Sequence, residues 1–143
     1  MIDNVLLTPL SRFSNPKGDV SHAMKKSDAG FAGFGEAYFT TILPGLIKGW
    51  HKHQRMTMNL IVPIGRTRFV IFDDRKNSKS KGNFYSVELS PENHQRLTIP
   101  PGLWTAFKGE SDAVSLILNL SSIEYDDLEV IRVDIEEIQY DWT

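Results

Sequence analysis

Short runs of alternating apolar and polar residues, separated by turn-forming residues, occupy most of the chain from position 36 onward. Alternation of this kind is typical of strands with one buried face, because successive side chains of a strand point to opposite sides. The pattern predicts strands over 37–43, 46–53, 56–63, 66–72, 84–89, 94–99, 104–108 and 113–120. Their spacing favours an all-β sandwich or barrel over alternating helices and strands.

The two ends of the chain depart from this pattern. Prolines and glycines interrupt residues 1–35, which we expect to be irregular. The prediction is a single domain with a barrel over 36–122 and a C-terminal tail over 123–143 that forms a short acidic helix or an extended segment. Tyr140 and Trp142 in that tail are expected to dock, either on the chain's own barrel or on a second subunit.

Composition narrows the function classes. A chain of 143 residues suffices for one self-sufficient core, and a net charge of -2 provides no field that would attract a nucleic-acid backbone. The apolar runs are too short to cross a bilayer, so no membrane insertion is expected. Cysteine is absent, which excludes thiol catalysis and agrees with a reducing compartment, and we take the cytoplasm as the expected location.

His51 and His53 are the most informative residues of the chain. They occupy alternate positions of a predicted strand, in the run Lys48-Gly49-Trp50-His51-Lys52-His53, so both imidazoles should project to one face. Two imidazoles in one pocket indicate proton transfer or metal binding. The bland alternative is a solvated pair on an exposed strand.

The segment 98–104 is a second motif, Thr-Ile-Pro-Pro-Gly-Leu-Trp, and reads as a strand that enters a tight turn. Together with the histidine segment 44–51 and the strands between them, it resembles the cupin superfamily. Within that superfamily, residues from about 36 to 125 resemble the nucleotide-deoxysugar isomerases, namely the dTDP-4-dehydrorhamnose 3,5-epimerases and the dTDP-4-keto-6-deoxyglucose 3,4-ketoisomerases.

This resemblance implies a cupin jelly-roll barrel, usually a homodimer, which binds a nucleotide-diphosphate sugar at the barrel mouth without metal or organic cofactor. The expected activity is epimerisation or ketoisomerisation of a nucleotide-activated 4-keto-deoxysugar for surface polysaccharide synthesis. The resemblance assigns His51 as the base that removes a proton from the carbon next to the ketone. His53 then donates to the enolate oxygen or holds His51 in place, and an acidic partner is expected to fix the His51 tautomer. Tyr38 matches an active-site tyrosine of the ketoisomerases, although it also reads as a core aromatic.

Two departures from the family pattern keep other functions open. The tyrosine acid of the epimerases would align with Ile117, and Thr105 stands where they carry a histidine after the turn. A hydrocarbon cannot protonate an enolate, so a binding cupin without catalysis is one alternative. A metal-dependent cupin is the other, but both ligands beyond the histidine pair are missing, and we predict no metal site.

Further residues are candidates for substrate binding. Cations could hold the diphosphate, polar residues could orient sugar hydroxyls, and a tryptophan could stack on the base or plug the core. These candidates are Glu36, Lys48, Arg55, Asn59, Arg68, Trp104 and Thr105.

Overall fold

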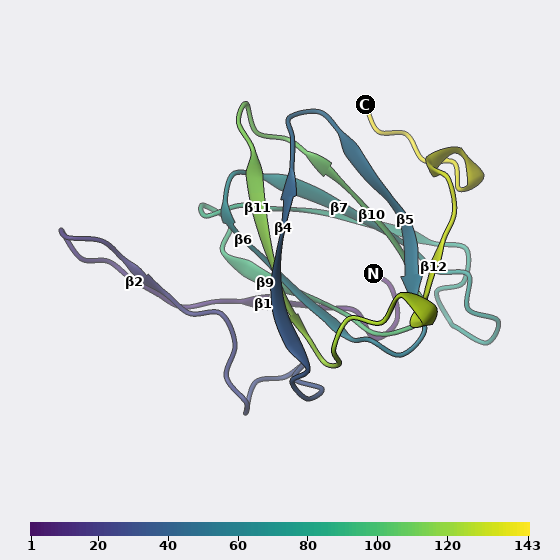
Figure 1. Ribbon diagram of the computed structural model, residues 1–143, viewed down its shortest axis with the longest axis horizontal. Coiled ribbons are helices and arrows are strands. Elements are labelled where there is room, and N and C mark those ends of the chain that lie inside the picture. Colours follow the sequence, from purple (N-terminus) through teal and green to yellow (C-terminus); the bar gives the residue numbers. More distant parts are fainter.

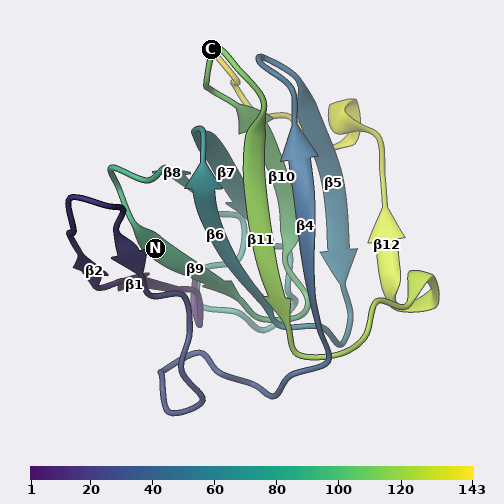
Figure 2. The ribbon, with the colours of Figure 1, turned by 60° about the vertical axis from the view of Figure 1, so that its left-hand side comes forward.

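The computed structural model describes all residues 1–143 and places two five-stranded antiparallel sheets face to face (Figure 1, Figure 2). One sheet has the order β1-β9-β6-β11-β4, and the other has the order β12-β5-β10-β7-β8. The strand bounds are β1 Leu6–Pro9, β4 Glu36–Ile42, β5 Ile47–His53, β6 Met58–Ile64, β7 Thr67–Phe72, β8 Phe84–Leu89, β9 Gln95–Ile99, β10 Trp104–Gly109, β11 Ser115–Ser121 and β12 Val130–Arg132. This is the predicted all-β jelly-roll barrel.

Every strand predicted between residues 36 and 122 is present, with ends shifted by at most two residues. The alternating side chains that face the interior form one apolar core between the sheets. Its members are Ile2, Val5, Ile42, Met56, Met58, Leu60, Val62, Phe69, Ile71, Leu89, Leu97, Ile99, Leu103, Phe107 and Ile117.

The N-terminal segment is more ordered than expected. Strand β1 pairs with β9, and β2 (Arg12–Phe13) with β3 (Val20–Ser21) forms a separate hairpin that extends away from the two sheets (Figure 1). Buried Arg96 on β9 donates to the carbonyls of Ala23 and Ala29, at 2.7 and 3.0 Å. These contacts fix the segment that leads into β4.

Of the two forms predicted for the tail, the extended one is present, as β12, and the acidic α-helix is not. Only a 3₁₀ turn, η1 Asp127–Glu129, forms there, and the chain then adds β12 to the edge of β5. A second 3₁₀ turn, η2 Ile135–Glu137, follows where an extended segment was predicted. The backbone groups of β12 are satisfied by hydrogen bonds to β5, whereas in the expected helix they would have been satisfied within the helix itself.

The tail docks on its own barrel, as one of the two predicted alternatives had it. Trp50 points to the outer face of its sheet, where its Nε1 donates to the carbonyls of Ile135 and Ile138. Trp142 and Tyr140 pack in the same outer cluster, with 6.1 Å between the ring centroids of Trp50 and Trp142. The tail therefore packs against the outer face of β5, and the inner face of β5 lines the interior.

Candidate active site

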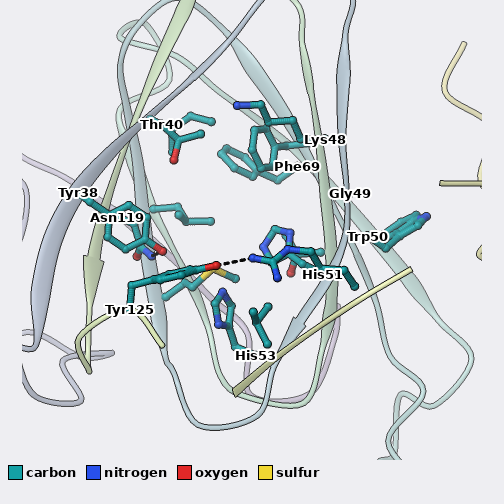
Figure 3. Close-up of a pocket in the computed structure, with 17 residues that line it drawn as sticks. Tyr38, Thr40, Lys48, Gly49, Trp50, His51, His53, Phe69, Asn119 and Tyr125 are labelled. Carbon is teal, nitrogen blue, oxygen red and sulfur yellow. Dashed lines mark hydrogen bonds between the residues drawn. The ribbon is translucent and has the colours of Figure 1, made fainter. Parts of the chain in front are cut away.

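A pocket of about 300 Å³ opens between the two sheets, at the end where β5 and β12 lie opposite β4 and β11 (Figure 3). Its volume lies at the lower end of the range for small-molecule sites. Apolar core side chains form its floor, and polar groups converge on it from both sheets. The lining residues are Tyr38, Thr40, Lys48, Gly49, Trp50, His51, His53, Met58, Leu60, Phe69, Thr105, Phe107, Ile117, Asn119, Tyr125, Val130 and Arg132.

His51 and His53 both line this pocket, which confirms the predicted placement of the two imidazoles. Strand alternation on β5 sends them inward and sends Lys52 outward to Asp74. The two ring centroids lie 5.4 Å apart, and the rings are nearly perpendicular. Gly49 lets this strand approach β10, because a Cβ at position 49 would collide with Ala106.

His51 is a neutral imidazole at neutral pH. Burial, with smaller contributions from His53 and Arg132, lowers the pKa of His51 to about 3. Its ring packs edge-on against Phe107, with 6.5 Å between the ring centroids. A neutral ring keeps a lone pair that can accept a proton.

The expected carboxylate partner is present, but it contacts His53 and not His51. Nδ1 of His53 is hydrogen-bonded to Oε1 of Glu129, and both side chains are buried. Oε2 of Glu129 accepts from the backbone N–H groups of Gln54 and Arg55, at 2.9 and 2.8 Å. Burial opposes ionisation of Glu129, but the hydrogen bonds from Arg55 and His53 outweigh it and lower the pKa of this carboxyl. An ionised carboxylate only accepts, so Nδ1 of His53 carries a proton and Nε2 is the other ring nitrogen left to bind a ligand.

Tyr38 lies on β4, on the wall that faces the histidines (Figure 3). Its hydroxyl accepts a hydrogen bond of 2.9 Å from Nδ2 of Asn119. Burial is the main cause that raises the pKa of Tyr38, so the phenol stays protonated at neutral pH. The structure thus brings the predicted tyrosine to the pocket that holds the two histidines.

Two cations border the pocket. Lys48 lies on the rim, where its Nζ donates to the carbonyl of Thr41 at 2.7 Å. Arg132 on β12 donates to the hydroxyl of Tyr125 and pairs with Asp127 at 2.8 Å. Both side chains are exposed enough to exchange these partners for an anionic ligand.

Thr105 and Ile117 line the pocket where the family pattern led us to expect other residues. Thr105 lies beside His51 on the neighbouring strand β10, and its buried Oγ1 has no hydrogen-bond partner. A buried hydroxyl without a partner is costly, and a ligand group could supply one. Ile117 adds only hydrocarbon to the wall.

Asn59 and Trp104 do not line the pocket, so the predicted contacts with substrate are wrong. Met58 and Leu60 are the inward residues of β6, and alternation turns the Asn59 side chain outward to the carbonyl of Gly30 at 3.0 Å. Trp104 likewise faces outward from β10, and its Nε1 donates to Asp74 at 2.8 Å.

Three charged candidates also lie outside the pocket lining. Arg55 pairs with Asp126 at 3.1 Å on the surface, and Arg68 donates to Glu110 at 2.7 Å on the outer face of β7. Glu36 accepts from the backbone N–H of Tyr125 at 2.9 Å. Arg68 is excluded by alternation, because its neighbour Phe69 is the residue that points inward.

Sequence reasoning missed four polar residues at this site: Asn119, Tyr125, Glu129 and Arg132. Only Asn119 carried a readable signal, as an amide at an inward position of an otherwise apolar strand. Arg132 reaches the pocket from β12, whose pairing with β5 local patterns do not encode, and Tyr125 and Glu129 lie in the tail just before β12. No group of three or more His, Cys, Asp or Glu side chains is arranged to hold a metal ion. No helix is long and apolar enough to cross a membrane.

Comparisons with known proteins agree with the architecture. The chain is 32% identical over 111 residues to the probable low-salt glycan biosynthesis epimerase Agl13 of Haloferax volcanii, which covers 74% of this chain and 71% of that protein. It is 26% identical over 146 residues to the spore coat polysaccharide biosynthesis protein SpsL of Bacillus subtilis, covering 99% and 97% of the two chains. The crystal structure of a dTDP sugar isomerase from Desulfovibrio desulfuricans matches with a TM-score of 0.93 at 31% identity, covering 99% of this chain and 92% of that one. All residues 1–143 match a single family, and the chain belongs to it: the dTDP-4-dehydrorhamnose 3,5-epimerase family.

Proposed function

We propose that the protein is an epimerase of a nucleotide-diphosphate 4-keto-deoxysugar that serves polysaccharide synthesis. The observation that carries this proposal is the placement of His51 and His53 in one pocket, 5.4 Å apart, opposite a tyrosine. The family of the chain supports the same substrate class, and its similarity to the glycan biosynthesis epimerase Agl13 and the spore coat polysaccharide biosynthesis protein SpsL supports the same type of pathway.

His51 is the proposed base. Its neutral ring can take the proton from the carbon next to the ketone, and the electron pair of that C–H bond then becomes part of an enolate. His53, held by Glu129 through Nδ1, holds His51 in place, or donates to the enolate oxygen when Nε2 also carries a proton. The apolar floor around both rings excludes water that would compete for the proton.

The substrate is proposed to place its sugar in the pocket and its diphosphate on the rim. Lys48 and Arg132 are the cations at the pocket, and they replace Arg55 and Arg68 as the diphosphate contacts that we favour. The unpartnered Oγ1 of Thr105 is placed to hydrogen-bond a sugar hydroxyl near His51. No metal or organic cofactor enters this scheme.

A turnover assay tests the proposal. The purified protein is incubated with a dTDP-linked 4-keto-6-deoxyhexose, and NMR of the product identifies any inverted carbon. We expect inversion next to the ketone. Saturable binding without any turnover would favour the binding cupin, and turnover that depends on stoichiometric iron, manganese or zinc in elemental analysis would favour the metal enzyme.

We further propose that the protein is a homodimer that acts in the cytoplasm. A two-stranded hairpin is marginally stable on its own, yet β2 and β3 extend from the body with Phe13 and Val20 58% and 59% exposed. A second copy that covers this hairpin would remove both apolar side chains from water. The cytoplasm is where a chain without cysteine and with a nucleotide-sugar substrate is expected.

A further inference from the structure

Asn119 is a buried amide on β11 that none of the proposed steps uses. It is 3% exposed, and its side chain joins the tyrosine wall of the pocket to the neighbouring strand β6. Its Oδ1 accepts from the backbone N–H of Asn59 at 3.1 Å, and its Nδ2 donates to the hydroxyl of Tyr38 at 2.9 Å.

The direction of these hydrogen bonds is fixed by the backbone. An N–H group can only donate, so the Asn119 atom next to the backbone nitrogen of Asn59 must be the oxygen. The NH₂ group of Asn119 therefore faces Tyr38, and the phenol oxygen must act as the acceptor.

The hydroxyl proton of Tyr38 is consequently directed away from Asn119. The only other hydrogen-bond partner of this hydroxyl is the sulfur of Met56 at 3.8 Å, and a thioether is a weak acceptor. The proton thus remains available to a ligand in the pocket. Tyr125, the other phenol of the site, differs, because it receives a hydrogen bond from Arg132 and can donate to Asp127 at 3.0 Å.

We propose that Asn119 is a positioning residue that makes Tyr38 the proton donor of the reaction, on the sugar face opposite the histidines. This inference rests on the proposed function. After His51 has taken the first proton, the phenol O–H bond breaks and a new C–H bond forms on the far face of the enolate carbon. The carbon is inverted, and the resulting phenolate and imidazolium return to their resting states by proton exchange with solvent.

The surroundings of Tyr38 support a neutral phenol before this step. Burial favours the uncharged form, and the acidic groups that act on it, Glu36 and Glu129, together with Tyr125, disfavour a phenolate. Only the hydrogen bond from Asn119 acts in the other direction, and it stabilises the phenolate that forms when the proton leaves. Asn119 would therefore both orient the donor and stabilise its product.

Asn119→Asp is the sharpest test, because it keeps the size of the side chain and reverses one hydrogen bond. A carboxylate would still accept from the N–H of Asn59 but would also accept the phenol proton. We expect kcat for inversion to fall by ~100-fold or more, the range for loss of a general acid, with little change in KM. Deuterium from solvent should still enter the sugar next to the ketone, now with retained configuration, because His51 can return the proton to the face it left.

Two readouts separate positioning from a structural role. Lowering the pH from about 7 to about 5 should restore part of the activity of the variant, because a protonated carboxyl can again donate to the phenol oxygen. Tyr38→Phe should lower kcat for inversion at least as much as Asn119→Asp does. The double variant, Asn119→Asp with Tyr38→Phe, should have a kcat no lower than that of Tyr38→Phe alone. Exposed Asn77→Asp controls for the added charge.

Inversion by Asn119→Asp within ~3-fold of the original protein, additive losses in the double variant, or parallel loss of exchange and inversion would each overturn the inference. If Asn119→Asp does not fold, Asn119→Ala replaces it and should show the same split between exchange and inversion. Failure of the unmodified protein to turn over any nucleotide-linked 4-keto sugar is a different result, which refutes the proposed function and the inference with it.

Discussion

At the scale of single residues, a buried hydrogen bond between Glu129 and His53 joins the tail to β5 beside the pocket. The histidines were predicted from their spacing on a strand, and both face the pocket. Glu129 was not predicted, because its partner lies 76 residues away and nothing in its local pattern distinguishes it from its acidic neighbours. Glu129 differs from the exposed acids of the tail only in its burial and in its hydrogen bond to the distant His53.

Glu129→Gln should destabilise the fold. The amide NH₂ would face His53 or the backbone donors of Gln54 and Arg55, and a buried donor left without an acceptor costs about 1–3 kcal/mol. Urea denaturation should show this loss in the free energy of unfolding, whereas exposed Glu137→Gln should change it by less than about 0.5 kcal/mol. Equal stability of the two variants would contradict the role given to this carboxylate.

The same carboxyl gives a pH dependence of defined sign. Because folding lowers the pKa of Glu129, its contribution to stability is complete above the unfolded value of about 4.3 and is lost as the pH falls through the lower folded value. The unfolding free energy should therefore decline less steeply with acid, below about pH 4.3, in Glu129→Gln than in the unmodified protein. Identical slopes would mean that Glu129 titrates alike in both states.

At the scale of elements, alternation predicted the central strands well, because each has one face in a single core. It did not decide the form of the tail, where a short acidic helix or an extended segment was expected and β12 formed. It left the inward face of β6 open: Asn59 was a candidate only if its own face lined the barrel, and Met58 and Leu60 point there instead. Local sequence thus predicts strands, but which side of a strand faces the pocket depends on the partner sheet.

Strand β5 provides the element-scale prediction. Gly49→Ala should lower the melting temperature and the activity together, because the added Cβ would collide with Ala106 and displace His51 two residues on. Gly82→Ala is the matched control, since Gly82 also has a positive φ, of 88°, but has open space around its Cβ position. In thermal unfolding, the melting temperature of Gly49→Ala should fall below that of Gly82→Ala, because only the Gly49 variant adds a collision to the backbone strain. Equal melting temperatures would show that β5 tolerates the extra carbon.

At the scale of the whole molecule, chain segments outside the barrel prediction complete the site. Residues 1–35 were expected to be irregular, yet β1 pairs with β9, and such pairing across about ninety positions is not visible in local patterns. The tail crosses the outer face of β5 and contributes Arg132 and Glu129 to the pocket side. The pocket is therefore formed by the barrel together with the tail, although its two histidines were recognisable from one hexapeptide.

The proposed dimer is tested at this scale. Phe13→Ser together with Val20→Ser should shift the protein from dimer to monomer in light scattering. The substituted hairpin would no longer expose apolar side chains that dimer formation removes from water. Leu128→Ser is a control, since Leu128 is 92% exposed but belongs to η1, next to β12, and not to the hairpin. A monomer before any substitution, or a dimer that survives the double substitution, would contradict the assignment of the hairpin as the interface.

The central claim is that an imidazole in the shared pocket takes a proton from the carbon next to a sugar ketone. Its most direct test is deuterium incorporation from D₂O into a dTDP-linked 4-keto-6-deoxyhexose, followed by mass spectrometry and NMR. We predict rapid incorporation next to the ketone with the unmodified protein and none above background with His51→Asn, at an unchanged melting temperature. Incorporation by His51→Asn at the original rate, or none by the unmodified protein with any such sugar, would contradict it.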